Sequence, residues 1–423
     1  MTFFGFGRFV GIGAAAAMLA GCGGSHSLPG APFNPTGTAS DAAPAAGKER
    51  VLYSFSGGND GGNAATGLAL DGQGNLYGTT VVGGTFACGT AFKLSPQAKP
   101  PWQETVLYNF DCFETGKAPH GGVALDAHGN LAGTTVAGGS GTGPCASDGC
   151  GVVFELTNTT ETILHDFTAG KDGFGPGNPV IFDSAGNLYG TTPDGGVGYQ
   201  GTVYEISSTA KGWHEKIIHA FTGGKDGGVG SLGALLLDGS GNLFGVTELG
   251  GAHGNGTVYK LSPASKKLST LYAFKGTPDA GSPYGGLTAD TSGNLYGTTY
   301  YGGANGLGSV FELSPRARGG YTERVLYSFK GGADGSSSTS TLVFAGSGDL
   351  YGTTSAGGGS CDCGTIFKLD PKSGKERVLH SFGGGSDGAY SYYGLTKGPN
   401  GALYGTTVAG GRFNQGAVFE FQP

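Results

Sequence analysis

The sequence predicts an all-β protein, a seven-bladed β-propeller with four antiparallel strands in each blade. One phrase recurs seven times, first at Asn75–Thr80 (NLYGTT) and then at Asn130, Asn187, Asn242, Asn294, Asp349 and Ala402. The glycines of successive copies are 55, 57, 55, 52, 55 and 53 residues apart. Each unit also holds four short apolar runs separated by turn residues, and four strands in about 50 residues are typical of a propeller blade.

The four runs of the first unit are rich in β-branched and aromatic residues, as strands are. They are Gly67–Asp71, Asn75–Thr79, Thr90–Leu94 and Thr105–Phe110, and we name them strands a to d from the axis outward. No stretch after the first residues shows sustained helical periodicity. The 90 glycines punctuate these strands, since glycine takes the backbone conformations that tight turns need.

Three of the a–b connections share a D-x-x-G frame, beginning at Asp71, Asp183 and Asp290. An aspartate there can accept hydrogen bonds from the turn backbone, and the final glycine can take a positive φ. We therefore interpret these aspartates as turn residues, with metal ligation as the alternative.

The two ends of the repeat region predict how the ring closes. The ordered part opens on an outer-strand sequence, Val51–Phe55, and ends on a third-strand sequence, Gly416–Phe421. The last blade therefore lacks its own fourth strand, and we expect residues 51–55 to supply it by pairing with 416–421. Such closure leaves no open edge strand. The predicted propeller spans residues 49–423.

The N-terminus predicts an exported protein. Arg8 precedes an apolar run from Phe9 to Ala20 that is too short to span a bilayer. The tetrapeptide Leu19–Cys22 resembles the bacterial lipobox, which implies a signal peptide over 1–22 and a lipid on Cys22. The alternative is a buried helix beside a chance cysteine. Residues 23–48, rich in Gly, Ala, Ser and Pro, predict a flexible tether. Gly23, by analogy with enteric lipoproteins, favours the outer membrane.

The repeat units resemble the GloVer tandem repeat of exported, variably anchored bacterial proteins. The matching phrases in one unit are Leu295–Thr299 (LYGTT), Gly302-Gly303, Gly308–Phe311 (GSVF) and Val325–Phe329 (VLYSF). The resemblance covers the chain from about residue 50 to its end. It implies a repeat architecture and an envelope location, and it carries no known catalytic residues.

Six further cysteines predict an oxidising compartment. Cys88 precedes strand c and Cys112 follows strand d of the same unit, so the antiparallel pair brings them together. Cys145 and Cys150 flank a short loop and are expected to pair. Cys361 and Cys363 either pair or stay free. A zinc site is the rival interpretation, but the cysteines fall in different blades.

The charge and the missing motifs exclude several classes of function. The formal net charge is −7 with no basic block, which argues against nucleic-acid binding. The sequence contains no nucleophile elbow, phosphate-binding loop, HExxH or dinucleotide fingerprint. We therefore expect no cofactor, no metal and a monomer.

In a propeller the d–a and b–c loops share one face, and that face usually carries function. Its d–a loops repeat an acidic turn, at Asp60, Asp172, Asp226, Asp334 and Asp387, with Asp279-Ala280 as a variant and Glu114 in the deviating second unit. Calcium binding by a ring of carboxylates is the alternative, but turn formation explains the aspartates more simply.

Residues that break the repeat are better candidates for function than residues that every blade shares. The candidate ligand-binding residues on this face are His120, Tyr284, Tyr300, Tyr301, Tyr390, Tyr392, Tyr393 and Arg412, with Phe86, Phe174, Tyr199, His253 and Phe413 nearby. Aromatic rings with a few polar groups suit sugars or peptides. The alternative is that the aromatic side chains only pack on one another.

Two acids on adjacent b–c loops, Asp194 and Glu248, are the candidate catalytic pair. A glycosidase needs two carboxylates roughly 5–10 Å apart. The sequence thus leaves three hypotheses: a non-enzymatic binding or scaffold module that holds a glycan or peptide, a carbohydrate-active hydrolase or lyase, and a purely structural surface protein.

Overall fold

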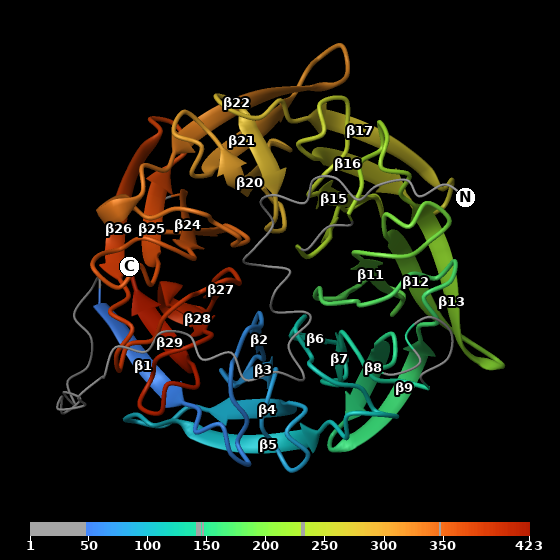
Figure 1. Cartoon of the computed structure of the whole chain (residues 1–423), viewed down its shortest axis with the longest axis vertical. Helices are drawn as coiled ribbons and strands as arrows, with labels where there is room; N and C mark the ends of the chain where they lie inside the picture. Colours follow the sequence, from blue (N-terminus) through green and yellow to red (C-terminus); the bar gives the residue numbers. More distant parts are fainter. Residues whose placement is uncertain (1–47, 141–144, 146–147, 230–232, 347) are drawn as a thin grey trace, which may run out of the picture. The chain divides into compact units, whose positions relative to one another are not determined.

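The computed structural model describes residues 48–423 except 141–144, 146–147, 230–232 and 347. The expected signal segment with Cys22, and the tether up to residue 47, lie outside the described residues. The described residues belong to one compact unit, Asp41–Pro423. They form seven antiparallel sheets, which Figure 1 shows as blades around a common axis. The predicted seven-bladed propeller is confirmed.

The first four blades use consecutive strands of the chain. Blade 1 consists of β2 (Ala69–Leu70), β3 (Leu76–Thr80), β4 (Thr90–Ser95) and β5 (Gln103–Asn109). Blade 2 consists of β6 (Val123–Leu125), β7 (Leu131–Thr134), β8 (Val152–Thr157) and β9 (Thr160–Asp166). Blade 3 consists of β10 (Ile181–Phe182), β11 (Leu188–Thr192), β12 (Thr202–Thr209) and β13 (Gly212–Ala220), and blade 4 of β14 (Leu236–Leu237), β15 (Leu243–Thr247), β16 (Thr257–Ser262) and β17 (Lys267–Ala273).

The last three blades contain the exceptions to this pattern. Blade 5 has an extra inner strand and consists of β18 (Ala280–Pro283), β19 (Thr288–Ala289), β20 (Leu295–Gly302), β21 (Ser309–Pro315) and β22 (Tyr321–Ser328). Blade 6 consists of β23 (Val343–Ala345), β24 (Asp349–Thr354), β25 (Thr365–Asp370) and β26 (Lys375–Ser381). Blade 7 combines β27 (Thr396–Lys397), β28 (Leu403–Thr407) and β29 (Ala417–Gln422) with β1 (Lys48–Ser54). The described loops contain two 3-10 turns, η3 (Gly332–Asp334) and η4 (Pro399–Gly401). No helix in the described part of the chain is long and apolar enough to cross a membrane.

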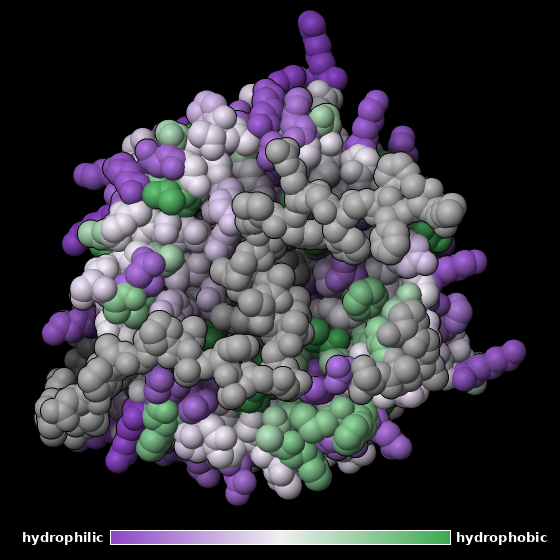
Figure 2. All heavy atoms as spheres, viewed as in Figure 1, coloured by the Kyte–Doolittle hydropathy of each residue, from purple (hydrophilic) through white to green (hydrophobic). Residues whose placement is uncertain are grey.

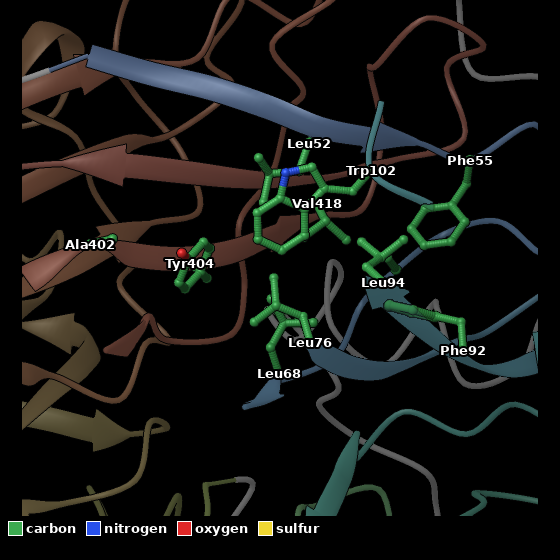
Figure 3. Close-up of a cluster of buried hydrophobic side chains, with 11 residues drawn as sticks. Leu52, Phe55, Leu68, Leu76, Phe92, Leu94, Trp102, Ala402, Tyr404 and Val418 are labelled. Atoms are coloured by element: carbon green, nitrogen blue, oxygen red, sulfur yellow. The ribbon is translucent and has the colours of Figure 1, made fainter. Parts of the chain in front are cut away.

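The ring closes through β1, as the sequence predicts. Strand β1 pairs antiparallel with β29, with Val51 opposite Phe419 and Ser54 opposite Ala417. Leu52 and Phe55 at this strand are fully buried in a cluster that also contains Trp102 of blade 1 and Tyr404 of blade 7 (Figure 3). The N-terminal strand therefore joins the first and last blades through both backbone hydrogen bonds and apolar packing.

The repeated glycine of the LYGTT phrase has a steric cause. A Cβ atom on Gly78 would lie 2.7 Å from Cζ of Phe92, whose ring covers the glycine from strand c. The same holds in every blade, where a Cβ added to this glycine would lie no more than 2.8 Å from the strand-c aromatic side chain. Atoms that close overlap, so only glycine lets the ring lie flat on strand b.

The covered rings also join each blade to its neighbour. The phenylalanine that follows strand d packs against the strand-c ring of the next blade, with centroids 5.0 to 5.4 Å apart at all seven seams. The first of these pairs is Phe55 on Phe92, at 5.0 Å, so the closing strand completes the same contact as the others. The glycine, the GTVF-type aromatic and the final residue of the LYSF-type phrase are therefore parts of one contact.

The turn aspartates act as the sequence predicts. Asp71 Oδ1 accepts hydrogen bonds from the backbone N–H groups of Gln73 and Asn75, both at 2.9 Å, and Gly74 has a φ of +85°. Equivalent bonds are made to Asp126, Asp183, Asp238 and Asp290.

The structure contains three disulfides. Cys88 is bonded to Cys112, Cys145 to Cys150 and Cys361 to Cys363. All three lie in d–a or b–c loops, so they brace the loops of the face on which the sequence places the candidate site. The Cys361–Cys363 bond settles a pairing that the sequence left open.

The glycine–aromatic contact predicts the outcome of a single substitution. Gly78→Ala should reduce the free energy of unfolding by about 1–3 kcal/mol, because the added methyl group overlaps the ring of Phe92. Gly72→Ala in the same blade is the control, since nothing would lie within 4 Å of a Cβ added there. Urea unfolding of both variants measures the difference, and equal stability would contradict this explanation of the repeat.

Candidate functional site

The d–a and b–c loops meet on one face of the ring. An antiparallel bridge joins the two loops of a blade, as between Gly62 and Val82 in blade 1 and between Phe174 and Asp194 in blade 3. Equivalent bridges occur in blades 2, 4, 6 and 7. We call this surface the loop face.

The aspartates of the d–a loops are occupied by their own turns. In six loops the carboxylate accepts a hydrogen bond from the backbone N–H four residues earlier, as Asp60 does from Ser56 at 2.9 Å. In the second unit Asp111 takes over and accepts from Phe113 and Thr115, which explains why Glu114 departs from the pattern. Among the described residues no group of three or more His, Cys, Asp or Glu side chains could hold a metal.

Blade 5 differs from the others on this face. Its loop bridge is extended into a strand, β18, that pairs with a lengthened β20 and places Gly281 opposite Tyr301 and Pro283 opposite Thr299. The extension carries Tyr284 directly after β18, and Tyr300 and Tyr301 at the end of β20. The blade with an extra strand is thus the blade with three of the candidate tyrosines.

The tyrosines of blade 5 contact one another. The ring centroids of Tyr284 and Tyr300 are 6.2 Å apart, and those of Tyr300 and Tyr301 are 4.7 Å apart in an edge-on arrangement. Burial raises the pKa of Tyr284, and the nearby groups Glu248, Tyr393, Tyr300 and Tyr392 raise it further. These electrostatic partners place side chains of blades 4, 5 and 7 around one point.

Glu248 is the acid of this cluster. It directly follows β15 of blade 4, and its backbone carbonyl lies beside Pro283, next to Tyr284, because both would crowd a Cβ added to Gly256. Burial raises the pKa of the Glu248 carboxyl. We call Glu248, Tyr284, Tyr300, Tyr301, Tyr392 and Tyr393 the tyrosine site.

The polar atoms of the tyrosine site lack partners within the described residues. Neither the carboxylate of Glu248 nor any of the five phenol groups makes a hydrogen bond or ion pair there. All six residues are at least partly exposed, and Tyr301 is 48% exposed. The site therefore presents one carboxylate and five phenols to a polar ligand that reaches the loop face.

The remaining sequence candidates lie at the edge of the site or away from it. Burial raises the pKa of Tyr392, and Tyr300 and Tyr390 add to the rise, so Tyr390 borders the site. Arg412 stacks over Phe413, 5.3 Å from the ring centroid, in the b–c loop of blade 7.

His120 and Asp194 are not among the groups that shift the pKa values of the tyrosine site. Desolvation lowers the pKa of His120 to about 4, and its Cβ lies next to Gly177 of blade 3. Burial raises the pKa of Asp194 and, separately, that of Glu248.

Tyr284 and Tyr392 occupy the same position of the repeat, and this shared position could have linked them from the sequence. The position lies six residues before the first residue of the a–b turn, and we call it the inner position. The other described residues at the inner position are Ala65, His120, Gly177 and Thr339. Thr339 donates from Oγ1 to the backbone oxygen of Tyr392 at 2.6 Å. The small Thr339 of blade 6 thus stands between the two tyrosines of blades 5 and 7.

The loop face also carries all the large apolar side chains that are exposed in the described part of the chain. They are Val82, Phe86, Phe113, Val197, Tyr199, Tyr301, Leu307, Tyr390 and Phe413, and Tyr199 is 74% exposed. In Figure 2 hydrophobic side chains gather over the lower blades of the ring, while hydrophilic side chains project from its rim. A one-sided distribution of this kind marks an interaction surface.

The fold and the paired cysteines define the class of protein, an extracytoplasmic seven-bladed propeller. The chain belongs to the Gloeobacter/Verrucomicrobia repeat family, whose model matches residues 141–332 and 231–423. The resemblance that the repeat phrases carry is confirmed. None of the curated proteins matches the chain.

Solved structures are similar to the chain at low sequence identity. A proposed 6-phosphogluconolactonase from Bacteroides uniformis is 14% identical with a TM-score of 0.51, over 78% of this chain and 88% of that one. A gluconolactonase from Xanthomonas campestris is 14% identical with a TM-score of 0.39, over 71% and 92%. TolB from Acinetobacter baumannii is 12% identical with a TM-score of 0.37, over 66% and 61%. At these identities the first similarity supports the propeller fold only.

Proposed function

We propose that the protein is a non-enzymatic binding module of the cell envelope, tethered through a lipid on Cys22, which holds a glycan or peptide at the tyrosine site. The observation that carries this proposal is the convergence of one carboxylate and five phenols, none of which has a partner among the described residues. Tyrosine rings offer an apolar face and a polar tip to the same ligand. The exposed apolar side chains of the loop face extend the contact area around the site.

The enzymatic alternative needs a second acid near the first. Asp194 and Glu248 each have a raised pKa, but burial is the only cause for either, and the two carboxyls do not perturb each other. Two carboxylates at glycosidase distance interact strongly enough to separate their pKa values. We therefore favour binding over catalysis at this site.

Removing the central ring of the site should weaken binding. Tyr300 touches both Tyr284 and Tyr301, so Tyr300→Ala should weaken the binding of whichever glycan or peptide the wild type selects on an array by about tenfold or more. Calorimetry with that ligand measures the loss.

The matched control is Tyr199→Ala, which removes an exposed tyrosine from the b–c loop of blade 3, outside the tyrosine site. It should bind as the wild type does. Absence of any ligand on both glycan and peptide arrays, or turnover of a glycan by the wild type, would overturn the proposal.

The lipid anchor predicts a change in cell fractionation. Cys22→Ser should move the protein from the membrane fraction to the soluble fraction and abolish its labelling by radioactive palmitate. The double variant Cys361→Ser, Cys363→Ser also removes cysteines, here a disulfide-bonded pair, and should stay in the membrane fraction. Membrane retention of Cys22→Ser would contradict the anchor.

A further inference from the structure

The tyrosine site holds an acid, but no positively charged group of the described residues contributes to its electrostatics. The groups that shift the pKa of Glu248, Tyr301 and Tyr392 include no lysine, arginine or histidine of the described residues. Burial raises the pKa of Tyr301, and Tyr300 and Glu248 raise it further. The half-buried carboxylate of Glu248 is therefore uncompensated by any positive charge of the described chain.

The position of Glu248 is unusual within the ring. The residue directly after the LYGTT-type phrase is Val81, Val136, Pro193, Tyr300, Ser355 or Val408 in the other blades. An acid at this semi-buried position is destabilising unless a partner neutralises it. Its replacement of an otherwise uncharged residue, beside the tyrosines of blade 5, indicates a ligand that supplies the charge.

We propose that the tyrosine site binds an amino sugar, whose ammonium group lies against Glu248 and whose ring stacks on the tyrosines; this inference rests on the proposed binding function. Aromatic rings attract a cation through their π faces, and a desolvated site strengthens the attraction. The hydroxyl groups of the sugar satisfy the five phenols, whereas a lysine side chain would leave most of them unpaired. The same charge disfavours uronic acids and phosphorylated glycans.

Calorimetry with three probes tests this assignment at pH 6. The glucosamine tetramer should bind at least about tenfold more tightly than the N-acetylglucosamine tetramer, since acetylation removes the charge. The preference should shrink in 1 M NaCl. Tetralysine should bind no more tightly than the acetylated tetramer, and tighter binding of tetralysine would overturn the amino-sugar assignment.

The decisive variant is Glu248→Gln, which keeps the shape of the side chain and removes its charge. It should bind both tetramers within about twofold of each other. Asp194→Asn removes an acid from the neighbouring b–c loop and should preserve the preference. Equal binding of both tetramers by the wild type overturns the charge assignment. Loss of all glycan binding in Tyr300→Ala would still support the proposed function.

An independent set of observations concerns the rim of the propeller. Six of the seven outer strands carry a glutamate four residues before a tyrosine or histidine, at Glu49, Glu104, Glu161, Glu215, Glu323 and Glu376. In all six glutamates Oε1 is buried and has no hydrogen-bond partner among the described residues. The seventh outer strand has Leu268 at this position, packed on a buried apolar cluster.

Each glutamate faces at least one acidic group of the preceding blade or of the loop that follows it, and Glu215 also lies near His214 of its own strand and Lys266 of the following blade. Tyr108, for example, donates to Oε2 of Glu161 at 2.9 Å across the seam. The facing groups are Asp387 for Glu49; Asp60 and Tyr53 for Glu104; Tyr108 and Asp111 for Glu161; His165, Asp172, His214 and Lys266 for Glu215; Asp279, Tyr272 and Lys275 for Glu323; and Asp334, Tyr327 and Lys330 for Glu376. Despite burial, the hydrogen bonds that they accept lower the pKa of Asp111, Asp172 and Asp387, so across these seams the glutamate is the member of the pair that takes the proton.

We propose that these six seams form a pH-responsive clasp, in which neutral glutamic acids hold adjacent blades together and their ionisation loosens the ring. Burial, followed by the facing aspartate, raises the pKa of Glu49 to about 8 and that of Glu104 to about 7. Burial also raises the pKa of Glu323 and of Glu376 to about 7. A native pKa above the unfolded value means that the native state binds more protons between the two values. The contribution to stability is complete below about pH 4.5 and is lost as the pH rises through 7 to 8.

Thermal unfolding of the wild type tests the clasp. The melting temperature should fall by about 5 °C or more between pH 5 and pH 8. Glu104→Gln mimics the neutral acid, so it should match the wild type at pH 5 and melt at a higher temperature at pH 8. Glu114→Gln changes an exposed acid in the nearby d–a loop and should behave as the wild type at both values.

A second measurement follows the protonation of the glutamate carboxyl groups directly. Carbon-13 NMR of glutamate-labelled protein should show carboxyl groups that titrate between pH 6 and 8 in the native state, and Glu104→Gln should remove one of them. A melting temperature that rises from pH 5 to pH 8, or native glutamates that all titrate near pH 4.5, would overturn the clasp.

Discussion

The contact between a glycine of strand b and the aromatic ring above it is the constraint on which the rest of the propeller depends. The ring lies flat because Gly78 and its six counterparts have no Cβ, and from there it reaches the phenylalanine of the preceding outer strand. One contact thus fixes the spacing within a blade and the docking between blades. A blade that lost it would pack poorly with its neighbour and misplace the loops that it carries. The repeat is uniform because every blade needs this contact.

The sequence predicts the architecture almost completely because each architectural residue occurs seven times. The blade number, the four strands, the turn aspartates and the closure by residues 51–55 all follow from repetition and phase. Two local departures from the repeat do not follow from repetition and phase. Asp111 and Thr115 form a turn by a different set of bonds, and the loop bridge of blade 5 becomes a strand. Both depend on single residues, for which the repeat offers no comparison.

The tyrosine site shows that the sequence does not reveal which candidate residues lie together in space. The aromatic candidates are visible in the sequence as exceptions, but blade 7 lies two blades away from blade 5. Tyr392 lies near enough to Tyr284 to raise its pKa, because their shared inner position lies close to the axis and Thr339 of the intervening blade is small. His120 occupies the same position in another sector and has no link to the site. Sequence reasoning thus finds the residues, and only the ring geometry decides which of them act together.

The closing strand has a mechanical consequence. Strand β1 is joined to the preceding 47 residues at Lys48, which pairs with Gln422 at the very end of β29. A pulling force transmitted along that preceding chain would act first on this terminal pair and open β1 from β29 one hydrogen-bonded pair at a time, rather than shear all pairs together. The seam that completes the ring would then also be its point of least resistance to tension, and Leu52 and Phe55, buried further along the chain, would resist the opening as it advances.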